Sequence, residues 1–135
     1  MMEGTSEKNR VDPGLVSILK QGEHLIASIH AALDDGELVR FQEHLLGQIG
    51  TVRARGVVID VGALDVLDSF ASRTLRNLAR MARLRGAETV VVGIHPEIAV
   101  TIVQLGMGLD DLHTALDLEE GLAMLNRLTD RQARR

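Results

Sequence analysis

Three aspartates and the serine that follows the last of them lie close together in a single short stretch of the chain. Residues 57–75 read VVIDVGALDVLDSFASRTL, which places Asp60, Asp65 and Asp68 after a hydrophobic run and Ser69 directly after the last of them. A serine at a helix start lies beside unpaired backbone N–H groups and the positive end of the helix dipole, where a phosphate is favourably received. The segment therefore makes Ser69 a candidate for an exposed phosphorylation site.

Phosphorylation of Ser69 would change the local charge abruptly. A phosphate adds about −1.5 to −2 charge at neutral pH, and three aspartates are already nearby. Such an excess of negative potential can displace a docked partner. Arg73 follows one helical turn later on the same face, where it can either pair with the phosphate or serve the partner interface.

The same residues have a purely structural interpretation. Serine and aspartate are both preferred N-cap residues, so Asp68 or Ser69 could simply cap the helix that follows. The residue types alone do not decide between capping and modification. Thr101 is a second candidate phosphosite, and ordinary helix packing or capping is its alternative role.

The helix expected after Ser69 also carries a basic stripe. Its arginines recur at steps of three and four residues, at Arg73, Arg76, Arg80 and Arg83. This spacing places them on one helix face, opposite the apolar residues. They form either a solvated face or a contact surface for an acidic partner.

Other kinds of site find little support in the sequence. The histidines are scattered without the i, i+4 pair typical of zinc sites: His24, His30, His44, His95 and His113. The chain has no cysteine, and Gly106–Gly108 lacks the Lys-Ser/Thr pair of a phosphate loop. A receiver domain with Asp60 as phosphoacceptor would need a lysine after a later strand, but the only lysines are Lys8 and Lys20. We expect no metal, no cofactor and no catalytic activity.

Length and composition predict one globular domain. The chain has 135 residues, of which 45% are hydrophobic and 25% charged, as in ordinary single-core domains. The only aromatic residues are Phe41 and Phe70, so the core must consist mainly of aliphatic side chains. A net charge of −4 provides no drive toward nucleic acid. No apolar run approaches the roughly 18 residues of a membrane span, and we expect a cytoplasmic protein.

The hydrophobic pattern predicts the elements that must position Ser69. Two short strands around the turn at Gln21-Gly22 indicate an antiparallel hairpin, and the later apolar runs are typical of buried parallel strands. The fold class is α/β, with a mixed, mainly parallel sheet of about five strands packed against about four helices. The expected strands are 15–20, 24–29, 56–61, 88–94 and 112–116, the helices about 35–52, 69–85, 96–105 and 118–128, and the flexible tails 1–13 and 129–135.

The Asp68-Ser69 pair resembles the STAS family of anti-sigma antagonists, whose phosphoacceptor serine or threonine follows an aspartate at this helix start. The stretch DSFASRTL differs from the Asp-Ser-Ser-Gly form of sporulation-type antagonists and is similar to the RsbS-type stressosome scaffold. The stretches VVVGIHPEIAVTIVQLG and TALDLEEGL resemble the same branch. The resemblance covers most of residues 15–128.

The resemblance implies a STAS domain over residues 14–128 that works as a non-catalytic scaffold and antagonist in stress signalling. It implies assembly with RsbR-type sensor paralogues and sequestration of a switch serine/threonine kinase, which phosphorylation of Ser69 releases. The expected partner contacts are Asp68, Phe70, Arg73, Arg76 and Arg80. The 14 residues before the first strand are too few for a sensor domain. The alternative is a simple anti-anti-sigma factor that binds an anti-sigma kinase directly, without a large assembly.

Overall fold

The computed structural model describes residues 12, 14–99 and 112–133. Predictions for Thr101, for Gly106–Gly108, for the end of the helix opened by Pro96 and for nearly all of the N-terminal tail lie outside the described residues. The elements are strands β1 (Val16–Gln21), β2 (His24–Ile29), β3 (Gly56–Asp60), β4 (Glu88–Val92) and β5 (His113–Ala115), and helices α2 (Asp35–Val52), α3 (Ser69–Leu84) and α5 (Leu118–Ala133). They confirm the predicted order, and Pro96 opens a helical turn over residues 96–99.

All five strands form one mixed sheet in the order β1-β2-β3-β4-β5. The predicted hairpin is confirmed, because β1 pairs antiparallel with β2, whereas β2, β3, β4 and β5 pair in parallel. The apolar run of β3 lies at the centre, as its continuous hydrophobicity predicted. Val57, Val58 and Ile59 are at most 1% exposed, since helices cover both faces of the sheet there.

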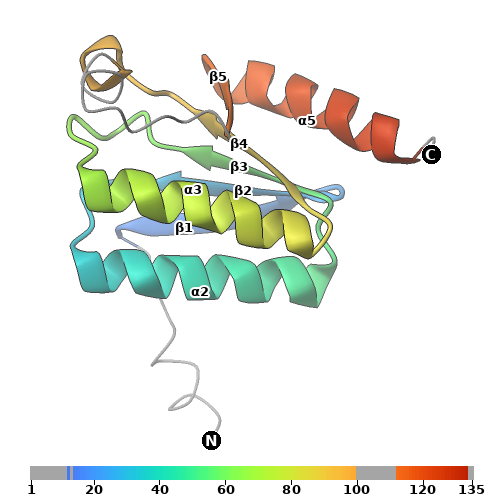
Figure 1. The fold of residues 1–135 in the computed structure, drawn as a ribbon, viewed down its shortest axis with the longest axis horizontal. Coiled ribbons are helices and arrows are strands. Elements are labelled where there is room, and N and C mark those ends of the chain that lie inside the picture. The colour runs from blue at the N-terminus through green and yellow to red at the C-terminus, as the bar shows by residue number, and fades with distance from the viewer. Residues whose placement is uncertain (1–11, 13, 100–111, 134–135) are drawn as a thin grey trace, which may run out of the picture.

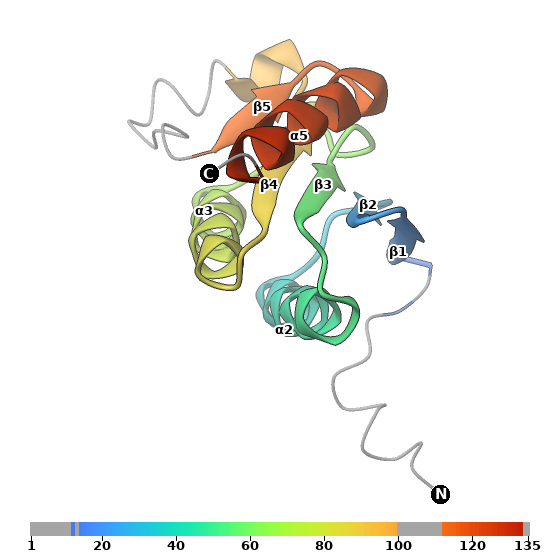
Figure 2. The same ribbon diagram turned by 90° about the vertical axis from the view of Figure 1, so that its right-hand side faces the viewer.

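Helices α2 and α3 lie side by side on one face of the sheet, and α5 lies on the other (Figures 1 and 2). Helix α2 starts at a capping box, in which the Asp34 carboxylate accepts from the Glu37 amide and the Glu37 side chain accepts from the Asp34 amide. Its predicted apolar stripe is confirmed at Leu38, Phe41, Leu45 and Ile49, which are all buried. The main core lies between these two helices and the sheet.

Helix α5 closes a second, smaller core on the opposite face. Val58, Val90, Val92 and Leu125 are buried there. The predicted end of the body at residue 128 was wrong for the helix, which continues to Ala133. The reason is that Thr129, the first residue of the expected tail, is 4% exposed and its hydroxyl donates to the Leu125 carbonyl.

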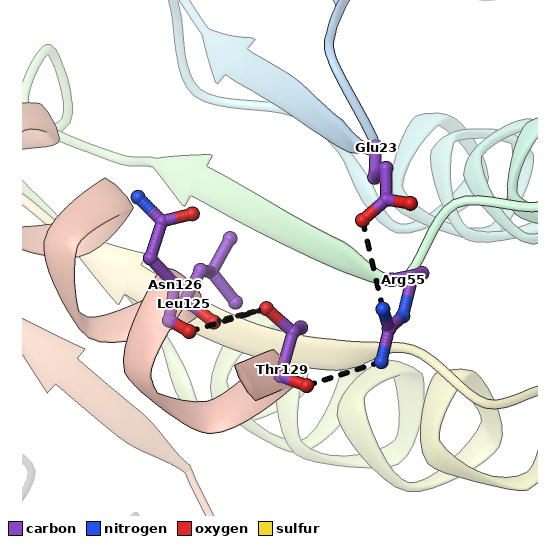
Figure 3. Close-up of polar contacts among 5 residues, drawn as sticks. All are labelled: Glu23, Arg55, Leu125, Asn126 and Thr129. Carbon is purple, nitrogen blue, oxygen red and sulfur yellow. Dashed lines mark hydrogen bonds and ion pairs between the residues drawn. The ribbon is translucent and has the colours of Figure 1, made fainter. Parts of the chain in front are cut away.

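Arg55 ties the carboxyl half of α5 to the rest of the fold (Figure 3). Its guanidinium donates to the Thr129 carbonyl oxygen at 3.0 Å and lies 3.6 Å from the Glu23 carboxylate in the hairpin turn. The Arg55 amide also donates to the Glu23 carbonyl, and its own carbonyl accepts from the Glu88 amide. One residue thus joins the hairpin, the sheet and the last helix at the amino ends of the parallel strands.

Gly121 marks where α5 approaches the sheet most closely. A Cβ at this position would lie 2.6 Å from Val92 Cγ1, whereas a Cβ at Gly47 in α2 would have no neighbour within 4 Å. We expect Gly121→Ala to lower the free energy of unfolding by about 1–3 kcal/mol through overpacking. Gly47→Ala should instead raise it by about 0.5–1 kcal/mol, because alanine favours a helix interior. Urea denaturation checks both, and stabilisation by Gly121→Ala would contradict the close approach.

His24 should make the stability of the fold depend on pH. Burial of the imidazole and the nearby Arg55 charge lower its pKa, although Glu23 opposes this. The folded state therefore binds a proton less readily than the unfolded chain, so stability is full above the unfolded pKa of about 6.5 and falls as the pH drops through the lower folded pKa. We expect His24→Gln to flatten the loss of stability between pH 7.5 and pH 5 in urea titrations. His30→Gln changes an exposed histidine and is the control. This variant should lose stability between pH 7.5 and pH 5 as the wild type does.

Candidate phosphorylation site

Ser69 lies at the carboxyl edge of the parallel strands, where the loop after β3 leads into α3. Helix α2 also starts at this edge, so the amino ends of both helices point the same way (Figure 1). Ser69 is the first residue of α3 and is exposed. The structure therefore places Ser69 on the surface at the amino end of a helix.

Asp68, and not Ser69, caps this helix. The Asp68 carboxylate accepts a hydrogen bond from the Ala71 amide at 2.8 Å, and the backbone of Asp68 is extended, as N-caps require. The Asp68 carbonyl also accepts from the Ser72 amide, which closes the first helical turn. Of the two residues that the sequence left open as the cap, Asp68 holds that role, and the Ser69 side chain is not needed for it.

The loop before Ser69 is held at both of its ends. At its start, the Val61 amide donates to the Val92 carbonyl, the Gly62 amide donates to Asp60 Oδ1 at 2.8 Å, and the Leu64 amide donates to the Val61 carbonyl. At its end, Leu64 and Leu67 are buried in the main core. The exposed residues of the loop therefore project from a fixed base.

The three aspartates singled out in the sequence have different surroundings. Asp60 is half-buried, and its carboxylate accepts a hydrogen bond from the Gly62 amide. Asp68 caps α3, and Asp65 is exposed on the loop. The structure places all three at the same edge of the sheet but does not bring their carboxylates into one cluster. Val66, which the sequence analysis passed over, is 70% exposed beside them.

A small apolar pocket of about 90 Å³ lies under this loop, between the starts of α2 and α3. Its lining includes Leu33, Leu38, Leu67 and Ala71. Pockets for drug-sized ligands are usually roughly 300–1,000 Å³, so this one is too small for a cofactor or a substrate of that size.

The arginines predicted as partner contacts on α3 differ in their exposure. Arg73 and Arg80 are exposed, whereas Arg76 is half-buried. Arg83 lies 3.9 Å from the Glu88 carboxylate. Phe70 is half-buried and packs against the main core, so only part of its ring is available to a partner. The basic stripe is therefore less uniform than its spacing predicted.

Three residues that the sequence analysis did not assign to the site support its loop. Gly62 and Gly93 follow β3 and β4, and a Cβ on Gly93, whose φ is +83°, would lie 2.8 Å from the Gly62 Cα. His95 Nε2 lies 2.7 Å from the Gly62 carbonyl oxygen. The signal in the sequence was a glycine just after each of two buried strands, because adjacent parallel strands end at the same edge.

The described residues include no group of three or more His, Asp or Glu side chains arranged to hold a metal ion. Among the helices that the structure describes, none is both long and apolar enough to span a membrane.

Comparison with known proteins places this chain in a family. Residues 16–121 match the family model described as the STAS domain. The chain belongs to the STAS domain family. The structure of an RsbS variant from Moorella thermoacetica is 37% identical with a TM-score of 0.75, and the match covers 85% of this chain and 97% of that one. This STAS domain thus resembles RsbS over nearly the full length of RsbS.

Two further relatives point to the same group. A chain in a structure described as the molecular architecture of the stressosome, a signal integration and transduction hub, is 36% identical with a TM-score of 0.68. That match covers 84% of this STAS domain chain and 98% of the other chain. The RsbT co-antagonist protein RsbRA of Bacillus subtilis is 33% identical over 100 residues, which are 74% of this chain but only 36% of that protein. The chain is a STAS-domain relative of the stress-signalling proteins RsbS and RsbR.

Because Asp68 caps α3 and Ser69 does not, substitutions at the two positions should differ in their effect on the stability of this STAS domain. We expect Asp68→Ala to lower the free energy of unfolding by about 1 kcal/mol, because the Ala71 amide loses its acceptor. Ser69→Ala should change it by less than about 0.5 kcal/mol, as at ordinary surface positions. Urea denaturation of the two variants checks this, and an equal loss in both would mean that Ser69 shares the capping role.

Proposed function

We propose that this STAS domain is a non-catalytic scaffold and antagonist in stress signalling, controlled by phosphorylation of Ser69. The observation that carries the proposal is the position of Ser69, which is exposed at the amino end of α3 while Asp68 supplies the cap. A serine with a structural role would be expected to hold the backbone amides itself. This serine can be modified without removing the hydrogen bond that starts the helix.

A phosphate on Ser69 has a clear physical consequence at this position. It meets the amino end of a helix, which favours an anion, and it enters a surface that already carries Asp65 and Asp68. A partner docked over the loop would meet a bulky dianion in place of a hydroxyl. We therefore propose that phosphorylation ends an interaction with the kinase, as the added charge and size oppose the docked surface.

The names of the relatives support a proposal for the partners of this domain. RsbRA is named as a co-antagonist of RsbT, and a chain 36% identical to this one occurs in a stressosome structure. We propose that this domain assembles with RsbR-type sensor paralogues into a large oligomer. We further propose that it sequesters an RsbT-like switch serine/threonine kinase and releases it when Ser69 is phosphorylated.

The contact surface is proposed to lie on the first turns of α3. Asp68, the outer part of Phe70, and Arg73 form its centre beside Ser69, and Arg76 and Arg80 extend it along the helix. Arg73 lies one turn after Ser69 and is exposed, so it can pair either with the phosphate or with an acidic group of the partner. Thr101 remains a predicted second phosphosite.

A simple anti-anti-sigma factor is the competing proposal, because it would use the same serine. The two functions differ in the size of the complex that the protein forms. The 37% identity to RsbS, over 97% of that chain, favours the scaffold.

Phosphorylation and kinase binding can be tested with the same set of variants. The purified protein is incubated with the switch kinase of its own organism and ATP, and the modified residue is mapped by mass spectrometry. We expect phosphate on Ser69, full kinase binding by Ser69→Ala, and kinase binding by Ser69→Asp that is weaker by at least about tenfold. Asn126→Asp adds the same charge at an exposed position of α5, on the other face of the sheet, and should leave the affinity unchanged.

The outcome against the proposal is equally specific. If Ser69 stays unmodified and Ser69→Asp binds the kinase as the wild type does, the switch function is wrong. If Ser69 is the switch, light scattering of the protein mixed with an RsbR-type paralogue separates the scaffold from the anti-anti-sigma factor. A particle in the megadalton range supports the scaffold, and a small heteromeric complex supports the anti-anti-sigma factor.

A further inference from the structure

His95 joins two loops that are far apart in the sequence. Its Nε2 lies 2.7 Å from the carbonyl oxygen of Gly62, 33 residues earlier, and the contact is partly buried. A carbonyl oxygen can only accept a hydrogen bond, so Nε2 carries the hydrogen and donates it. The loop after β4 is therefore bonded directly to the start of the loop that leads into α3 and Ser69.

Backbone packing between two glycines brings His95 within reach of Gly62. A Cβ on Gly93 would lie 2.8 Å from both the Cα and the amide nitrogen of Gly62, and 3.1 Å from Asp60 Oδ1. Gly93 also has a φ of +83°, which a side chain would strain. The chain can turn at this point because Gly93 has no side chain, and the turn brings His95 to the neighbouring loop.

The Gly62 peptide is where the path of the Ser69 loop is set. Its amide donates to Asp60 Oδ1 and its carbonyl accepts from His95, so both sides of the residue are held. The next fixed points are the buried side chains of Leu64 and Leu67, followed by the Asp68 cap. Without the His95 bond, the half-buried Gly62 carbonyl would lose its donor and the peptide could rotate, which would change the course of the residues before Ser69.

We propose that His95 is a positioning residue for Ser69. His95 holds the loop before Ser69 in the conformation in which the kinase modifies the serine. The inference rests on the proposed function, because it concerns how Ser69 is presented. Phosphoryl transfer depends mainly on alignment of the attacking hydroxyl with the phosphate. A loop that is ordered before the kinase binds avoids the entropy cost of ordering it in the complex.

Three variants of His95 separate the hydrogen bond from the bulk of the ring. In His95→Gln the amide nitrogen reaches about as far as Nε2 and can donate to Gly62, whereas in His95→Asn it is too short, and His95→Ala has no donor. We expect His95→Ala and His95→Asn to lower kcat/KM for Ser69 phosphorylation by roughly three- to tenfold, the equivalent of one ordinary hydrogen bond. His95→Gln should recover most of the wild-type value.

Amide hydrogen exchange provides a readout that does not need the kinase. In His95→Ala, exchange should accelerate at residues 62–68 and stay unchanged in β2 and α5, which a general loss of stability would not produce. His113→Ala is the matched control, because His113 Nε2 contacts Glu88 at 3.5 Å at the other end of the sheet. It should leave both the loop exchange and the phosphorylation of Ser69 unchanged.

Each result decides a different point. Wild-type kcat/KM in His95→Ala would overturn the proposal, and so would a His95→Gln variant that behaves like His95→Ala. If His95→Ala does not fold, the comparison of His95→Gln with His95→Asn makes the same test. If the wild-type protein is not phosphorylated at Ser69, the proposed function fails, and the exchange of residues 62–68 still shows whether His95 orders the loop.

Discussion

The parallel pairing of β3 with β4 is the contact on which the rest of this structure depends. It buries Val58 and Val90 under α5 and Ile59 and Val91 under α2 and α3, so both cores share the same pair of strands. Because the two strands run the same way, both of their outgoing loops leave at one edge of the sheet. The loop that leads to Ser69 and the loop that contains His95 therefore leave the sheet side by side, and they are in contact through His95 and Gly62.

The contact between these two loops adds to the bonds that hold the exposed loop before Ser69. Loops usually have few contacts and move more than the elements that they connect. Here the first part of the loop is bonded to β4 and to His95, and its second part is anchored by Leu64 and Leu67. Asp65 and Val66 are left exposed between these anchors. A fixed base with a short exposed surface would suit Ser69 as the proposed phosphoacceptor, because a kinase must align with one conformation of its target.

The two faces of the sheet are stabilised differently. The face under α2 and α3 has a large aliphatic core, whereas the α5 face depends on four buried aliphatic residues, on the close approach of Gly121, and on the bond from Arg55 to the Thr129 carbonyl. Small cores contribute less hydrophobic free energy, so specific contacts matter more on that face. The Ser69 site lies at the opposite end of the strands from Arg55, and the two regions are thus separate parts of the fold.

The sequence by itself determined the elements and the candidate residue, because both depend on local patterns. Apolar periodicity located the strands and helices, and the Asp68-Ser69 pair marked the start of α3. The sequence left the identity of the N-cap of α3 undecided, since the side chains of Asp68 and Ser69 can both accept from a backbone amide. Only the structure assigned that bond to Asp68. The continuation of α5 to Ala133, the half-burial of Arg76 and the contact of His95 with Gly62 also came only from the structure. These depend on which segments pack together across the sheet, and a pattern of neighbouring residues does not contain that information.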